Sequence, residues 1–237
     1  MTDAIGLSPT QGRSESSRKR RWLRWVVVGV ATILVLVVAG LYVFVHFLGG
    51  ATPARLTLPE LHASGVGLGS SSIDGTWTVG NGSLAGYRVR KDFLGPGDSV
   101  VGRTSGVTGH VVISHSRVSS ASFRVDLTSL KSNGKTQSQF AGILGTVSHP
   151  DATLTLAAPI VPRSSPALNK EFRAYATGQL AMHGSTRSVT FDITARYSGS
   201  ALEATGSIPI AFSDWDIKAP TFLQNDGVVE FLLVMHR

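Results

Sequence analysis

The sequence predicts an all-β domain, built as an antiparallel barrel or sandwich and preceded by a single transmembrane helix. The first observation is the alternation of apolar and polar residues from residue 75 onward, as where Phe123, Val125 and Leu127 alternate with Arg, Asp and Thr. Short segments of this kind, separated by Gly, Ser, Asn and Pro, are typical of antiparallel sheets with one buried face. The second observation is an uncharged apolar run over 25–48.

The apolar run of residues 25–48 is 24 residues long and has no formally charged side chain. As a helix it would measure about 36 Å, which is enough to cross a bilayer with some tilt. Basic residues cluster on its N-terminal side, so the positive-inside rule predicts that residues 1–24 form a cytoplasmic tail. We therefore expect a single-pass cell-membrane protein whose chain after residue 49 lies outside the cytoplasm. A cleaved signal peptide is the alternative, but its apolar region would be about 7–15 residues long.

Composition excludes several classes of site. The chain has no cysteine, which removes disulfides, thiolate chemistry and cysteine-based zinc sites together. The net charge of +7 suggests nucleic-acid binding at first sight. Much of this charge belongs to the tail of residues 1–24, however, and no arginine-rich stripe follows, so nucleic-acid binding is not expected.

The chain after the apolar run is predicted to contain a linker and one domain. Residues 49–74 mix Gly, Ser and Pro with scattered leucines and show no period, so we expect a flexible linker there. Residues 75–237 form the β domain. One short helix is expected over 136–144, with Thr136 as its N-cap and Phe140, Ile143 and Leu144 at helical spacing.

Period-two alternation also predicts which side chains face the interior of the domain. The expected lumen positions are Phe123, Val125, Leu127, Leu154, Leu156, Ala176, Gly178, Leu180, Met182, Phe191, Ile193, Ile208 and Ile210. Small residues in the middle of strands leave space, which would suit a lipid-like guest in an eight-stranded barrel. Alternatively, large side chains across the core fill that space and no cavity exists.

Motifs for catalysis or metal binding are incomplete. Residues 129–136 end like a phosphate-binding loop, but Ser129 stands where the first glycine is needed. Residues 132–135 fit a serine-x-x-lysine pattern without its partner motifs. The histidines lack metal-ligand spacing, and His183 is expected to stabilise a turn. We therefore predict no catalytic residue, no metal site and no enzyme activity.

Several segments resemble the YceI-like family of polyisoprenoid-binding proteins. The similar segments are 77–79, 82–90, 101–104, 107–109, 123–130, 149–153, 178–189 and 212–220. They follow the family's order over about 160 residues, although His149 stands where the family has a tyrosine.

The resemblance implies a fold and a function. The fold is an antiparallel lipocalin-like barrel of eight strands, and the lumen would hold an isoprenoid quinone or a polyprenyl chain for storage or transfer. It implies no cofactor other than such a cargo, and it points to a bacterial protein. Lipid is expected to enter through a portal formed by Trp215, Phe222 and Leu223, or past Phe140–Leu144. The alternative function is an extracytoplasmic protein-interaction module with a filled core.

Overall fold

The computed structural model describes residues 31–40, 52–60, 72–92, 99–132, 135–136, 138–164 and 166–237. Its contacts divide the chain into two compact units, Met1–Ala51 and Thr52–Arg237. Residues 31–40 of the first unit form a helix inside the apolar run of residues 25–48. The rest of that run and the tail of residues 1–24 lie outside the described residues. In the described part of the chain, no helix is both long and apolar enough to span a membrane.

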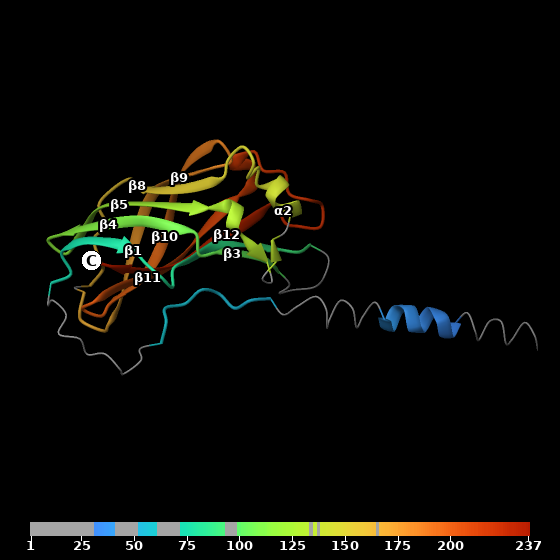
Figure 1. The fold of residues 1–237 in the computed structure, drawn as a ribbon, viewed down its shortest axis with the longest axis horizontal. Helices are drawn as coiled ribbons and strands as arrows, with labels where there is room; N and C mark the ends of the chain where they lie inside the picture. Colours follow the sequence, from blue (N-terminus) through green and yellow to red (C-terminus); the bar gives the residue numbers. More distant parts are fainter. Residues whose placement is uncertain are drawn as a thin grey trace, which may run out of the picture. The chain divides into compact units, whose positions relative to one another are not determined.

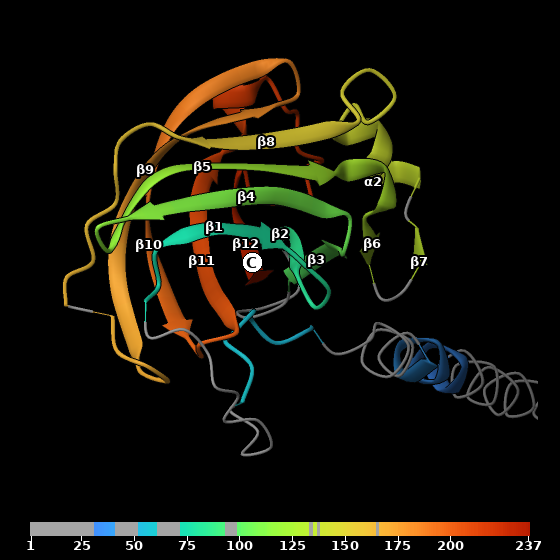
Figure 2. The same ribbon diagram turned by 60° about the vertical axis from the view of Figure 1, so that its left-hand side comes forward.

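The second unit contains one antiparallel β-sheet that closes on itself. Its strands are β1 (Gly75–Val79), β2 (Leu84–Arg90), β3 (Ser99–Thr104), β4 (Val107–Ser114), β5 (Arg117–Asp126), β6 (Lys131–Ser132), β7 (Lys135–Thr136), β8 (Asp151–Leu156), β9 (Glu171–Met182), β10 (Ser185–Tyr197), β11 (Ala201–Ala211) and β12 (Asp226–His236). Within the described residues, β1, β4, β5, β8, β9, β10, β11 and β12 form a ring, because β1 pairs with both β4 and β12. The predicted all-β, eight-stranded antiparallel barrel is therefore confirmed (Figures 1 and 2).

The first half of β12 pairs with β2 instead of β1, and β3, β6 and β7 continue from there. Val228 to Leu232 face β2, whereas Met235 and His236 face β1. This branch continues the barrel wall, since β2 also lines the interior, and it brings the end of β3 next to the segment that follows β5.

A tight hairpin joins the two longest strands, β9 and β10. His183 and Gly184 have φ angles of 50° and 77°, the left-handed values that a two-residue type I′ turn requires. Met182 pairs with Ser185 directly beside the turn. The structure therefore places His183 in a turn, where its ring Nδ1 lies 2.8 Å from the carbonyl oxygen of Trp215.

One end of the barrel, here called the helix end, carries the short helices. They are η2 (Leu127–Ser129), α2 (Ser138–Ile143) and η3 (Phe212–Trp215). The helix predicted over 136–144 is thus present, but it begins at Ser138. Thr136, the predicted N-cap, lies in β7, because Lys135 and Thr136 pair with Ser132 and Lys131.

The opposite end, here called the plug end, is closed by Ile73, Trp77 and Tyr197. Trp77 is fully buried, and its indole Nε1 donates a hydrogen bond to the Ile73 carbonyl at 2.8 Å. The Trp77 and Tyr197 rings meet edge to face with centroids 5.6 Å apart. Two hydrogen bonds hold the chain across this end of the barrel: the Tyr197 hydroxyl donates to the Ser72 carbonyl, and the Ser116 amide donates to the Asp74 carboxylate.

The linker predicted over 49–74 is described at residues 52–60 and 72–74. Residues 52–60 have no regular secondary structure. They lie along the outer wall of the barrel and accept hydrogen bonds from its side chains. The described part of this segment is therefore held on the domain surface.

Candidate functional site

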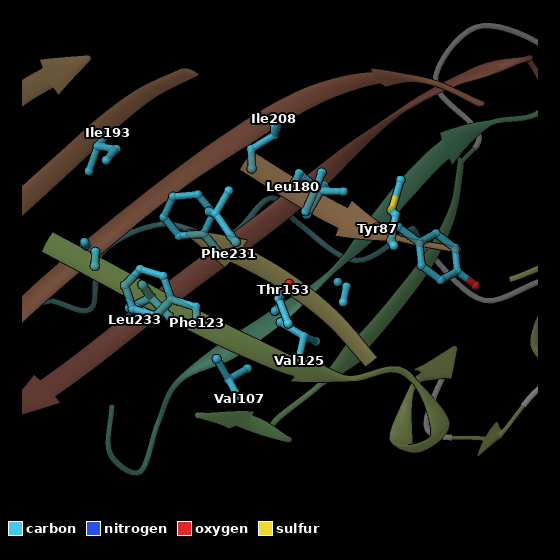
Figure 3. Close-up of a pocket in the computed structure, with 18 of the residues that line it drawn as sticks. Tyr87, Val107, Phe123, Val125, Thr153, Leu180, Ile193, Ile208, Phe231 and Leu233 are labelled. Carbon is cyan, nitrogen blue, oxygen red and sulfur yellow. The ribbon is translucent and has the colours of Figure 1, made fainter. Parts of the chain in front are cut away.

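A cavity of about 210 Å³ runs through the interior of the barrel. Side chains from opposite walls line it, among them Phe123 on β5, Leu180 on β9 and Phe231 on β12. Figure 3 shows these side chains gathered around one space. An apolar cavity of about 150 Å³ is large enough to hold a benzene ring, so this cavity has room for a hydrocarbon.

Most of the predicted lumen positions line the cavity. Those that do are Phe123, Val125, Leu127, Leu154, Leu180, Met182, Ile193, Ile208 and Ile210. The predicted positions that do not border it are Leu156, Ala176, Gly178 and Phe191. The alternation in the sequence therefore identified the inward face of each strand, but not how far the cavity extends along it.

Three of these four positions, Ala176, Gly178 and Phe191, lie where the barrel interior is filled. Phe191 pairs across the sheet with Ala176, and its ring packs edge to face on Phe231 with centroids 5.9 Å apart. A Cβ atom on Gly178 would lie 3.0 Å from Leu154 Cδ1. Here the small residues face large partners, as the filled-core alternative expected, whereas Ala174 and Ala204 border the cavity.

Sequence reasoning missed the part of the cavity wall that β12 contributes. Val229, Phe231, Leu233 and Met235 all line the cavity from this strand. The strand reads DGVVEFLLVMH, so apolar residues on its other face conceal the alternation. Ile73, in the segment predicted as linker, lines the cavity at the plug end.

The cavity lining contains few polar side chains. They are Tyr87, Ser116, Thr153 and His183. Burial raises the pKa of the Tyr87 phenol above its ordinary value, so this group stays neutral across the physiological range. In Figure 3 its hydroxyl points away from the other labelled side chains. Ser116 and His183 belong to opposite ends of the barrel, so these groups do not converge on one reacting centre.

The predicted portal residues have three different environments. Leu223 is 5% exposed and lines the cavity. Trp215 is buried beside it without bordering the cavity, and its Nε1 donates to the Leu180 carbonyl at 3.4 Å. Phe222 is 43% exposed to solvent. The other candidate gate also reaches the cavity, since Ile143 and Leu144 line it at the same end.

The helix end also brings two histidines together. The His149 and His183 rings have centroids 5.7 Å apart. Among the described residues, no group of three His, Cys, Asp or Glu side chains is placed so that it could hold a metal ion. Of the two histidines, His183 borders the cavity.

Comparison with known proteins gives one family and several related folds. Residues 77–235 match the YceI-like domain. One similar solved structure is a polyisoprenoid-binding domain from Saccharophagus degradans implicated in plant cell wall breakdown. It has 14% identity and a TM-score of 0.54, and the match covers 68% of this chain and 97% of that one. BcnA from Burkholderia cenocepacia has 21% identity and a TM-score of 0.54 over 64% and 95% of the two chains.

A third similar structure is a mutant YceI protein of Campylobacter jejuni with a monobromobimane guest. It has 13% identity and a TM-score of 0.50 over 62% of this chain and 90% of that one. No relative is found among curated protein sequences. At these identities the structural matches establish the fold of the barrel.

Proposed function

The chain belongs to the YceI-like domain family, and we propose that it is a membrane-anchored binding protein that holds a polyisoprenoid lipid inside its barrel. The apolar cavity of about 210 Å³ is the observation that carries this proposal. An isoprenoid quinone or a polyprenyl chain has the long hydrocarbon tail that such a lining suits. The similar domain from Saccharophagus degradans, which is described as polyisoprenoid-binding, supports the same class of cargo.

The energetics favour exchange of cargo with a membrane. Burial of hydrocarbon yields roughly 0.8 kcal/mol per methylene, so an isoprene unit of five carbons gains about 4 kcal/mol on leaving water. A bilayer offers a similar gain, which leaves the net free energy of transfer between membrane and barrel near zero. The protein would therefore store lipid or pass it on without an energy source.

An anchor beside the membrane would shorten the aqueous step of this exchange. The uncharged run of residues 25–48, with its basic N-terminal flank, supports a single transmembrane helix with residues 1–24 in the cytoplasm. The barrel would then lie on the extracytoplasmic side. The absence of cysteine fits this proposal, because the barrel is closed by strand pairing and core burial.

The filled-core interaction module is the less favoured alternative. Its interior would resemble the region around Phe191 and Ala176 throughout, whereas Ala174 and Ala204 border open space. The cavity lining offers no convergent set of polar groups that would act on a bound chain, so we propose binding without catalysis.

Filling the cavity tests the cargo proposal. Ala204 lines the cavity on β11, and Ala204→Phe would place a ring in the space that the hydrocarbon needs. We expect the unit of residues 52–237, expressed in bacteria, to lose most of its co-purifying polyisoprenoid, measured by solvent extraction and mass spectrometry. Ala211→Phe is the matched control, because Ala211 is exposed on the same strand. A folded Ala204→Phe variant with undiminished lipid, or a parent domain without lipid, would refute the proposal.

The portal prediction is tested at Phe222, the exposed apolar residue of the loop after η3. The Phe222 carbonyl accepts a hydrogen bond from the Asp92 amide at 3.0 Å, a contact that a side-chain substitution leaves in place. We expect Phe222→Ser to slow lipid transfer between vesicles several-fold, with a stability change within about 0.5 kcal/mol. Val161→Ser is the control, since Val161 is 56% exposed near the plug end. Equal slowing in both variants would show that the portal is not at Phe222.

A further inference from the structure

The outer face of β12 carries side chains that are buried although they point away from the cavity. Phe231 and Leu233 line the cavity, so Glu230 and Leu232 point to the opposite face of the strand. Glu230 is nevertheless only 2% exposed and Leu232 only 9%. Something outside the barrel wall must cover them.

The covered area continues on both sides of β12, onto β2 and β3 on one side and onto β11 and β10 on the other. On the β2 side, Arg88 is 9% exposed, and Val101, which pairs with it from β3, is 4% exposed. Arg88 Nε lies 2.7 Å from Glu230 Oε1. On the other side of β12, Arg196 is 5% exposed, and its Nη2 lies 2.5 Å from Glu203 Oε2.

Residues 52–60, here called the strap, cover this outer face. Figure 1 draws the strap in cyan alongside the barrel. Its backbone carbonyls accept hydrogen bonds from the wall: Pro53 from Arg88 at 2.8 Å, Ala54 from Arg103, Leu56 from the Thr205 hydroxyl at 3.1 Å, and Pro59 from Arg196 at 2.5 Å. Buried guanidinium groups need acceptors for their N–H groups, and the strap carbonyls supply some of them, although Arg103 Nε is buried without an acceptor among the described residues.

The strap has a definite direction along the barrel. Its first residue, Thr52, lies beside Ser99, where β3 begins at the helix end; the Ser99 amide is 3.5 Å from Thr52 Oγ1. Pro59 contacts Arg196, next to Tyr197 at the plug end. The chain therefore reaches the barrel surface at the helix end.

We propose that the strap holds the barrel with its helix end toward the membrane. This inference rests on the proposed membrane anchor over residues 25–48. A free linker of residues 49–74 could extend about 90 Å, whereas the chain from residue 48 to Thr52 spans at most about 14 Å. Docking of the strap thus shortens the tether between barrel and membrane. It also determines the end of the barrel from which the tether leaves.

The helix end has the surface that a bilayer would accept. Val147, in the turn after α2, is 95% exposed, and Phe222 is 43% exposed at the same end. Exposed apolar side chains of this kind favour contact with a lipid surface. The plug end also exposes apolar side chains, since Val161 is 56% and Leu168 is 53% exposed, so the direction of the strap, and not exposed apolar surface, distinguishes the two ends. The strap would therefore present the lipid portal, and not the sealed end, to the membrane.

The test uses the full chain in vesicles of phosphatidylcholine and phosphatidylglycerol with a nitroxide-labelled headgroup. Because the chain has no cysteine, Val147→Cys and Ser200→Cys each give one fluorophore site, at the helix end and at the plug end respectively. The 11 residues of β12 separate the two ends by about 35 Å, beyond the contact range of the nitroxide. We expect the label at position 147 to be quenched and the label at position 200 to remain at its unquenched level.

A variant with a longer tether separates the role of the strap from that of the exposed side chains at the helix end. A Gly/Ser insertion of about 20 residues between Ala51 and Thr52 adds up to about 70 Å of reach but leaves the strap intact. We expect it to abolish the quenching at position 147, while lipid extracted from the same samples stays unchanged. Equal quenching at the two positions, or quenching unaffected by the insertion, would overturn the proposal for the strap. Failure of the chain to float with the vesicles would instead refute the anchor, and the strap's orienting role with it.

Discussion

Trp77→Ala is expected to lower the free energy of unfolding of the barrel by about 3–5 kcal/mol, the usual cost of truncating a buried tryptophan. Trp77 is fully buried at the plug end, packs edge to face on Tyr197 and donates its indole hydrogen to the Ile73 carbonyl. The substitution leaves a cavity and an unpaired carbonyl at the same place, and partial collapse of the site cannot compensate for both. Urea unfolding of residues 52–237 measures the change.

Tyr175→Ala is the control for this prediction. Tyr175 is 56% exposed, and its ring stacks under the Arg163 guanidinium at 3.8 Å. An exposed cation–π contact is worth about 0.5–1 kcal/mol. The free energy of unfolding should therefore fall much less in Tyr175→Ala than in Trp77→Ala. Similar losses for the two variants would mean that Trp77 does not seal the plug end as described.

Glu230→Ala is expected to lower the free energy of unfolding by about 3–5 kcal/mol, because it leaves a buried positive charge without its partner. The Glu230 carboxylate is 2% exposed and lies 2.7 Å from Arg88 Nε and 3.5 Å from Arg103 Nη2. The same substitution should loosen the strap, since both arginines also donate to strap carbonyls. Hydrogen exchange of residues 52–60 should therefore become faster, while the cavity-facing strands stay protected.

Two comparisons isolate the cause of this loss. The double variant with Arg88→Met and Glu230→Leu removes both charges and should recover much of the stability, because apolar residues can replace a buried ion pair. Asp192→Ala breaks the exposed pair with Arg163, whose atoms are 3.7 Å apart, and should cost about 0–1 kcal/mol. If the double variant is as unstable as Glu230→Ala, stranded charge is not the cause.

The sequence predicted the inward faces of strands whose outer side meets water. Phe123 and Val125 alternate with polar residues, because β5 has solvent on its outer face, and both line the cavity, as does Leu127 at the start of η2. β12 gave no such signal. Its outward Leu232 is buried under the strap, so apolar residues occupy both faces and the period disappears.

The extent of the cavity could not be predicted, because it depends on which side chain stands opposite each small residue. Ala174 and Ala176 lie two residues apart on the same face of β9. Ala174 borders the cavity, whereas Ala176 pairs with Phe191, whose ring fills the space in front of it. That difference arises from the register between β9 and β10 and from the packing of Phe231, which period-two alternation does not contain.

The docking of residues 52–60 left no pattern in the sequence for a physical reason. The strap is held through its backbone carbonyls, which every residue carries. Its side chains therefore need no period, and Pro, Leu and Thr without alternation resemble a linker. The corresponding feature in the barrel is a set of charged residues on the outer face, Arg88, Glu230 and Arg196, which the structure buries.

Photolabelling with a polyprenyl chain that carries a diazirine at its far end tests the central claim most directly. After irradiation of the folded domain, peptide mass spectrometry locates the modified residues. The account predicts adducts on cavity-lining residues such as Phe123, Leu180 and Leu233, with loss of these adducts in Ala204→Phe. Adducts confined to the outer wall, or a cavity that stays unlabelled while the domain remains folded, would contradict the claim that the barrel holds a polyisoprenoid chain.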